Sequence, residues 1–241
     1  MEFLDDTLSM ASTRAQPTKS RKNTAMDVAT KKPRGTREPL HRERIEREAL
    51  ALIEAQGLDA FTTRKLGERL GCEAMSIYYH FPSKAHLLDA LVDRLLSTLP
   101  IPSKDIAPAQ RLRALVQRWR TMARQHPRFY LWMAMHRWNS VTGIGFMAEV
   151  LGCFHDAGLA AEGAARGFRA LGYYVLGATL DETRGYAQGP SSLNPMSEAD
   201  VKEQHPLVYQ AGQYFMPTEF DGTFALGLGV LLRGLKVEGV Q

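Results

Sequence analysis

Residues Thr62 to Lys84 read TTRKLGERLGCEAMSIYYHFPSK, which is two short helical patterns separated by a glycine. In the first pattern Leu66 and Leu70 fall on one helical face, and Gly71 ends the pattern. Thr62 is the expected N-cap, because its hydroxyl can accept a hydrogen bond from the free N–H groups of the first turn. Two short helices that meet at a tight turn indicate a helix-turn-helix, whose second helix lies in the major groove of DNA.

The second pattern spans about residues 74–81, and its outer face is unusually polar and aromatic for a surface helix. Ile77 and Phe81 are expected to be core anchors instead. Hydroxyl and imidazole groups on the outer face can bond phosphates or base edges, and alanine or methionine can touch a thymine methyl. At the start of the preceding helix, hydroxyl, guanidinium and free N–H groups can bind phosphate. The residues predicted in this way to contact DNA are Thr63, Arg64, Glu73, Ala74, Met75, Ser76, Tyr79 and His80.

A glycine at the corner of two helices is common, so the spacing leaves a second interpretation open. In an ordinary αα-hairpin, Tyr78 and Tyr79 would be core aromatics rather than DNA contacts. Periodicity by itself does not decide between a DNA-reading helix and this hairpin.

Helical periodicity continues on both sides of this stretch. A helix is expected from about residue 40 to Gly57, and Ser83 is expected to cap another over about 84–99. Further helical patterns lie near 108–125, 128–140, 143–157, 161–187, 206–215 and 218–237, with a polar connection at 189–200. Alternating β-branched runs bounded by turns are missing from the sequence, so strands are not expected. The prediction is an all-α fold of about nine to ten helices, with a three-helix DNA-binding head over 39–99 and a ligand-binding and dimerisation body over 100–241.

The N-terminal residues 1–38 are rich in Ser, Thr, Lys, Arg and Pro and show no periodicity, which is typical of a disordered tail. Between Arg14 and Arg47 there are eleven Lys or Arg and four Asp or Glu, whereas the whole chain has a net charge of only +4. A basic end suggests a polyanionic partner such as DNA. A solvated tail that only keeps the protein soluble is an equal alternative.

The run from Thr62 to Leu91 resembles the TetR (tetracycline repressor) family of bacterial regulators. In that family Thr-x-Arg-x-Leu-x-x-x-Leu-Gly is followed by Ser/Thr-aliphatic-Tyr-x-His/Tyr-Phe/Val and then Asn/Ser-Lys-x-x-Leu-Leu. The matching residues here are Thr62, Arg64, Leu66, Leu70, Gly71, Ser76, Ile77, Tyr78, His80, Phe81, Ser83, Lys84, Leu87 and Leu88. Gly67 and Cys72 depart from the usual Ala and Val. The resemblance adds Thr62, Tyr78 and Lys84 to the predicted DNA contacts.

Two later stretches resemble the dimer helices of the tetracycline-repressor branch, namely Tyr174–Glu182 and Phe224–Leu235. The resemblance implies a homodimer in which helices near 161–187 and 218–237 pair across a two-fold axis as a four-helix bundle. The 224–235 stretch is apolar all round and rich in glycine, so it is best hidden against another helix. A buried core helix within one chain is the alternative.

The resemblance also implies that the body binds a small molecule, which changes the separation of the two DNA-reading heads. The body is rich in aromatic and methionine side chains, which suit a largely apolar effector but equally build an ordinary core. The residues predicted to contact this unknown effector are Met122, His126, Tyr130, Trp132, Met133, His136, Phe146, Met147 and Tyr173.

His126 lies just before Pro127, where tetracycline-binding members place a metal-contacting histidine. A histidine at a helix end more often caps the last carbonyls. A matching His/Asn pair near 95–102 is missing from the sequence, so a tetracycline–magnesium complex is not expected. The sequence therefore predicts no metal and no cofactor.

Composition sets further limits. No stretch approaches the ~20 apolar residues of a membrane span, and no secretory signal is evident. Two cysteines, Cys72 and Cys153, suggest neither a zinc site nor a disulfide framework, so a cytoplasmic location without membrane contact is expected. Asp181 and Glu182 are candidate catalytic carboxylates, but the sequence has no Glu-x-x-His repeat, nucleophile elbow or phosphate-binding glycine loop. An enzyme is therefore not expected, and a DNA binder without an effector is the other alternative.

Overall fold

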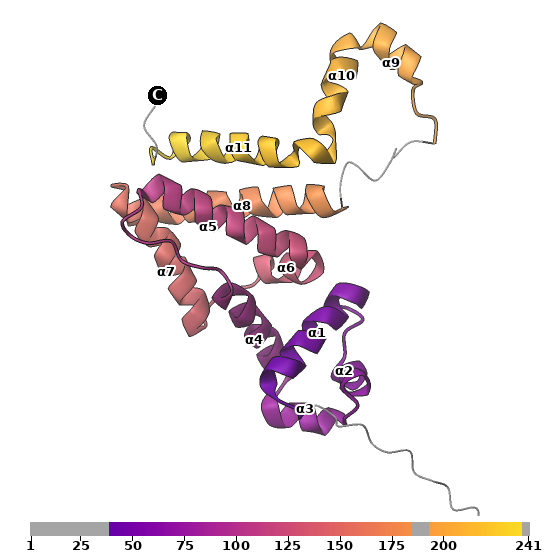
Figure 1. The fold of residues 1–241 in the computed structure, drawn as a ribbon, viewed down its shortest axis with the longest axis vertical. Coiled ribbons are helices and arrows are strands. Elements are labelled where there is room, and N and C mark those ends of the chain that lie inside the picture. Colours follow the sequence, from indigo (N-terminus) through magenta and orange to yellow (C-terminus); the bar gives the residue numbers. More distant parts are fainter. Residues whose placement is uncertain (1–38, 185–192, 238–241) are drawn as a thin grey trace, which may run out of the picture. The chain divides into compact units, whose positions relative to one another are not determined.

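The computed structural model describes residues 39–184 and 193–237 of the chain. The predicted basic tail over 1–38 lies outside these described residues, as do 185–192 and 238–241. Within the described ranges every regular element is a helix, which confirms the all-α prediction (Figure 1). From Leu40 onward the chain is one compact unit, so the division into a head over 39–99 and a body over 100–241 stays a prediction.

The first four helices are α1 (Arg42–Gln56), α2 (Thr63–Leu70), α3 (Ala74–His80) and α4 (Lys84–Ser97). Helix α1 packs against α2 and α4, and α2 packs against α3. The helix end and the N-cap predicted from the sequence are both present. Gly57 ends α1 with a positive φ of 85° and donates its N–H to Ile53 O at 2.8 Å. Ser83 caps α4 by accepting from His86 N at 3.3 Å.

The next helices are α5 (Pro108–Gln125), α6 (Pro127–Met135), α7 (Val141–Asp156), α8 (Ala161–Arg184) and, at the end of the described chain, α11 (Phe220–Gly234). Helix α8 is the central element, since it contacts α5, α6, α7 and α11. Helix α11 runs alongside α8 (Figure 1). Helix α1 contacts α6, and α4 contacts α7, so the first four helices are joined directly to those that follow. Among the described helices, none is long and apolar enough to cross a membrane.

Between α8 and α11 lie α9 (Glu198–Gln204), α10 (Pro206–Ala211) and two 3₁₀ turns (Gly212–Phe215 and Pro217–Glu219). Helix α9 falls largely beyond the predicted connection at 189–200, and it brings the described α-helices to eleven. No residue of α9 is buried, so it has no apolar stripe that periodicity could detect. Its stabilisation is local, because Ser197 caps it by accepting from Asp200 N at 3.1 Å, and acidic side chains occupy its first turn.

An ion cluster around one buried arginine ties α5, α8 and α11 together. Arg120 is 1% exposed, and its Nη2 lies 2.7 Å from Glu182 Oε1 while its Nη1 lies 2.8 Å from Asp221 Oδ1. Its guanidinium carbon also lies 4.3 Å from the ring centroid of Phe224. Glu182, considered above as a catalytic carboxylate, is therefore engaged in fixing helices to one another.

Candidate DNA-binding face and body cavity

The helix-turn-helix forms as the sequence predicts. Thr62 Oγ1 accepts from Lys65 N at 3.2 Å, which confirms the predicted N-cap of α2. Gly71 ends α2 in the left-handed conformation with φ 70°, which glycine adopts without a steric penalty. A Cβ on Gly67 would lie 2.8 Å from the backbone oxygen of Cys72, so a glycine there lets α2 approach the turn closely.

Helix α3 has one buried side and one exposed side. Ile77 is 1% exposed and anchors the helix in the core, as does Phe81 just after it. On the other side Tyr79 is 88% exposed and Met75 is 72% exposed, and Tyr78 is also at the surface. The αα-hairpin interpretation required both tyrosines in the core, so their exposure contradicts it.

The polar groups of this face have defined local contacts. The hydroxyls of Thr63 and Tyr78 lie 3.0 Å apart, so α2 and α3 present two neighbouring hydroxyls. Tyr79 and His80 meet edge to face, with ring centroids 5.4 Å apart. Lys84 donates to Phe61 O at 3.1 Å, so its ammonium is already engaged at the start of α4. Helices α2 and α3, their N-cap residues and the first residue of α4 carry all the positions predicted to contact DNA: Thr62, Thr63, Arg64, Glu73, Ala74, Met75, Ser76, Tyr78, Tyr79, His80 and Lys84.

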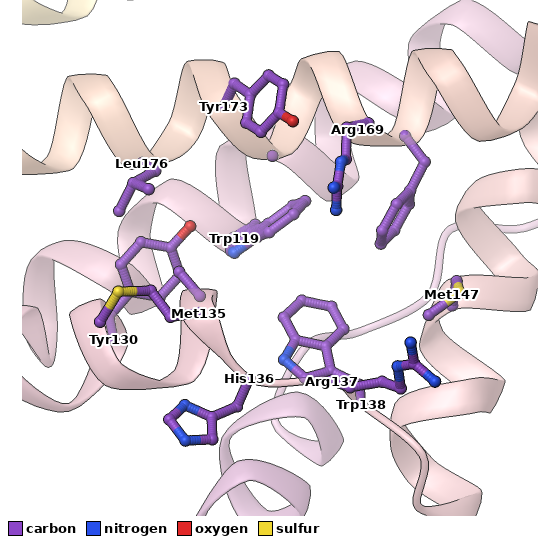
Figure 2. Close-up of a pocket in the computed structure, with 13 residues that line it drawn as sticks. Trp119, Tyr130, Met135, His136, Arg137, Trp138, Met147, Arg169, Tyr173 and Leu176 are labelled. Atoms are coloured by element: carbon purple, nitrogen blue, oxygen red, sulfur yellow. The ribbon is translucent and has the colours of Figure 1, made fainter.

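A cavity of about 410 Å³ lies among α5, α6, α7, α8 and the segment that follows α6 (Figure 2). It is lined by Trp119, Tyr130, Ala134, Met135, His136, Arg137, Trp138, Met147, Phe168, Arg169, Gly172, Tyr173 and Leu176. Trp119 is its central wall, since its ring centroid lies 5.6 Å from that of Trp138 and 6.1 Å from that of Phe168. The size and the aromatic lining are those of a small-molecule site.

The structure brings only part of the predicted effector set to this cavity. Tyr130, His136, Met147 and Tyr173 line it. The remaining predicted residues, Met122, His126, Trp132, Met133 and Phe146, do not. Three of these five are buried in the core, because an apolar side chain at helical spacing packs between helices as readily as it lines a hollow. Effector contact at all nine positions stays a prediction.

Sequence reasoning did not select the two arginines of the lining. Arg137 comes from the segment after α6, and Arg169 comes from α8. A single arginine in a helical pattern is typical of a solvent-facing position, so the sequence did not indicate that either arginine lines a cavity. Trp119 and Trp138 were visible as large aromatics, but their convergence depends on how α5 packs against the segment after α6.

His126 lies between α5 and α6 and is half-buried. Burial lowers the pKa of its imidazole, and the nearby Glu54 carboxylate partly offsets this effect. Its Nδ1 is buried, and the described protein atoms offer it no hydrogen-bond partner. In residues 39–184 and 193–237 there is no cluster of three or more His, Cys, Asp or Glu side chains that could hold a metal ion.

A helix-turn-helix with an exposed second helix, joined to a helical body with an aromatic cavity, is the arrangement of DNA-binding transcriptional regulators. Residues 45–91 match the family model described as "Bacterial regulatory proteins, tetR family", and residues 103–238 match "Tetracyclin repressor-like, C-terminal domain". The chain belongs to the TetR family.

Curated relatives agree with this assignment. The tetracycline repressor protein class A from transposon 1721 of Escherichia coli is 30% identical over 201 residues, which cover 79% of this chain and 88% of that protein. The HTH-type transcriptional repressor DrrR1 of Streptomyces coeruleorubidus is 26% identical over 231 residues, which cover 88% of this chain and 83% of the relative.

Solved structures share the fold. A possible TetR family transcriptional regulator from Streptomyces coelicolor A3(2) is 25% identical, with a TM-score of 0.65 over 81% of this chain and 98% of that one. The Streptomyces coelicolor TetR family protein ActR, solved in complex with actinorhodin, is 23% identical with a TM-score of 0.64, covering 82% of this chain and 97% of the other.

Proposed function

We propose that this regulator is a repressor that binds a pseudo-palindromic operator as a homodimer and is released by a small molecule that enters the body cavity. The observation that carries the DNA half of the proposal is the exposed side of α3, where Tyr79 and Met75 have no core to fill. A two-fold dimer presents two such helices, which suits two half-sites on one face of the duplex. Tyr79, His80 and Ser76 then read base edges, while Thr63, Arg64 and Tyr78 hold the phosphates.

The dimer is supported by the apolar side of α11. Phe224, Leu228 and Leu232 are buried against the rest of the chain, but Leu226 is 68% exposed and Val230 is 55% exposed. A helix buried on one side only is not the fully enclosed core helix that was the alternative. Exposed apolar side chains in a row are typical of a protein interface. We assign this side of α11, together with α8, to the partner copy.

The effector half of the proposal rests on the cavity. ActR has been solved with actinorhodin, and a TetR variant of Acinetobacter baumannii has been solved with minocycline, so structural neighbours hold small molecules. Here the cavity walls are mostly aromatic and aliphatic, which supports a largely apolar effector. A tetracycline–magnesium complex is not favoured, because the sequence has no matching His/Asn pair near residues 95–102. We also infer that the chain is cytoplasmic and regulatory rather than catalytic.

The test of the DNA half uses operator duplexes selected from a random pool by the full-length protein. Tyr79→Ala should weaken binding of the selected duplex by about 10- to 100-fold, because a base contact is worth roughly 1–3 kcal/mol. The melting temperature and the dimer mass should stay unchanged, since the side chain is exposed. Tyr214→Ala, which removes a ring that is 61% exposed but lies between α10 and α11, is the matched control. If Tyr79→Ala binds as tightly as wild type, the recognition helix is misassigned.

The test of the dimer half is the mass in solution. Leu226→Glu combined with Val230→Glu should convert the dimer to a monomer in multi-angle light scattering, because like charges would be buried at the interface.

The alternative function is a DNA binder without an effector. Such a protein would keep its operator affinity whatever small molecule is added, which separates this second candidate function from the first.

A further inference from the structure

The cavity has a positive rim. Arg137 and Arg169 both line it, both are exposed, and none of its lining residues in the described chain is Asp or Glu. The described residues supply no ion-pair partner to either guanidinium. The guanidinium carbon of Arg169 lies 5.6 Å from the ring centroid of Tyr173. Two cations without a protein carboxylate make the mouth of the cavity attractive to an anion.

The view into the cavity shows how these arginines lie. Arg169 projects from α8 toward the space that Trp119 and Trp138 border (Figure 2). Arg137 lies next to Trp138 and extends toward Met147 (Figure 2). The two guanidiniums therefore come from different elements and lie on different sides of the aromatic lining. Arginine is well suited to this role, since its planar fork binds a carboxylate in a bidentate manner.

Two side chains of the lining also carry buried donor groups, Trp119 Nε1 and Tyr130 Oη. Trp119 is 4% exposed and Tyr130 is 1% exposed, and neither Trp119 Nε1 nor Tyr130 Oη makes a hydrogen bond of normal geometry to a described protein atom, although the Trp119 side chain lies close enough to the Tyr130 hydroxyl to lower its pKa in part. Burial raises the pKa of Tyr130 far above its usual range, so the phenol stays neutral and keeps its proton. Buried donors without an acceptor are costly, and a ligand oxygen would satisfy them.

The walls between these groups are flat rings. Trp119 and Phe168 are nearly parallel, with an interplanar angle of 29°, and Trp138 stands at 60° to Trp119. Such walls favour a planar ring system over a branched aliphatic chain, because aromatic rings gain most from stacked and edge contacts. A volume of about 410 Å³ has room for two or three fused rings.

We propose that this cavity binds a flat aromatic acid. Its rings lie against Trp119, a carbonyl or hydroxyl oxygen accepts from Tyr130 Oη or Trp119 Nε1, and its carboxylate or phenolate pairs with Arg169 or Arg137. The proposal rests on the proposed function for its regulatory meaning. It narrows the effector from a largely apolar compound to one with an anionic group.

The experiment compares acids with neutral amides of the same shape. The full-length protein is titrated with 2-naphthoate and 2-naphthamide, and with anthraquinone-2-carboxylate and anthraquinone-2-carboxamide, while tryptophan fluorescence is recorded. At least one acid should bind about 3- to 10-fold more tightly than its amide at low ionic strength. The preference should shrink in high salt, because exposed charge pairs are screened.

Variants assign the preference to particular atoms. Arg137→Gln with Arg169→Gln should bring the acid down to the affinity of the amide and leave the amide within about 2-fold. Arg166→Gln, which removes another exposed arginine of α8 that does not line the cavity, should leave the preference intact. Tyr130→Phe should weaken acid and amide alike by about 3- to 10-fold without changing their ratio.

The inference is overturned if acid and amide of both pairs bind equally, if none of the four probes binds at millimolar concentration, or if the double arginine variant keeps the preference. Operator binding is measured separately on the same samples. A protein that prefers the acids but binds no selected duplex would refute the proposed function and leave this inference standing. A protein that binds the duplex but shows no acid preference would refute this inference and leave the DNA-binding part of the proposed function standing.

Discussion

The recognition helix and the body cavity are built in opposite ways. Helix α3 exposes Met75 and Tyr79 because those positions lie on one side of a short helix whose other side is anchored by Ile77. The cavity instead gathers side chains from Trp119 to Leu176, supplied by four helices and a connecting segment. A face made by one helix follows from periodicity, whereas a hollow depends on how several helices pack.

The same contrast holds for charge. Between α1 and α2, Arg69 Nε lies 2.7 Å from Glu48 Oε2, with the arginine 43% exposed. In the body Arg120 Nη2 also lies 2.7 Å from Glu182 Oε1, with the arginine 1% exposed. Equal distances do not imply equal energies, because water screens the first pair and is excluded from the second. Burial rather than bond length decides what each pair contributes.

The largest expected effect comes from breaking the buried pair. Arg120→Met should lower the free energy of unfolding by about 3–5 kcal/mol, because Glu182 would stay buried and, among the described residues, would keep Arg124 at 3.5 Å as its remaining ion-pair partner. Urea unfolding at fixed protein concentration measures it. Arg69→Met is the control and should cost no more than about 1 kcal/mol. Equal losses in the two variants would refute the contrast between buried and exposed pairs.

A smaller loss is expected at a close contact between α7 and α8. A Cβ on Gly167 would lie 2.7 Å from the ring of Phe154, which is fully buried and has no room to move. Gly167→Ala should therefore destabilise the protein by about 1–3 kcal/mol. Gly145→Ala on α7, where a Cβ would meet nothing within 4 Å, should stabilise it by up to about 1 kcal/mol through helix propensity. If Gly167→Ala is as stable as Gly145→Ala, the close approach is wrong.

Glu54 links helix α1 to helix α6. From the end of α1 its carboxylate accepts from Phe129 N at 2.9 Å and from Arg128 N at 3.2 Å, which caps the first turn of α6. Glu54→Gln should cost about 1 kcal/mol, because the amide keeps one acceptor but loses the charge. Thermal unfolding measures this, with Glu162→Gln at the exposed start of α8 as a control expected to change less. A loss in the control equal to that of Glu54→Gln would argue against the cap.

The smallest expected effect is a pH dependence of stability that arises from His126, between α5 and α6. Burial holds the pKa of His126 below its ordinary value of 6.5, so the unfolded chain takes up a proton there before the folded chain does. Stability should fall as the pH drops from 7 through 6.5 and level off below the folded pKa. His126→Gln should flatten this part of the curve by less than about 1 kcal/mol. His155→Gln, which removes a histidine that is 83% exposed, is the control and should leave the pH dependence of stability unchanged. If His126→Gln also leaves it unchanged, the pH dependence does not come from His126.

Much of the DNA-reading part was predictable. The caps at Thr62 and Ser83 and the glycine at Gly71 all stand as the sequence indicates, because each is set by contacts within one turn. Helix α9 escaped prediction for the opposite reason, since an exposed helix has no apolar period. Only some of the residues predicted to contact the effector line the cavity. Periodicity predicts which side of a helix faces inward, but it does not predict whether a neighbouring side chain fills the space there.

The sequence by itself determined the all-α class, the helix-turn-helix between Thr62 and Lys84 and the family, since these depend on local periodicity, caps and a contiguous motif. Only the tertiary structure decided that Tyr79 is exposed and Trp119 enclosed. It also decided that Arg137 and Arg169 face one cavity and that Arg120 joins three helices. The physical reason is that burial and convergence arise from contacts between residues far apart in the chain, which spacing along one helix does not encode.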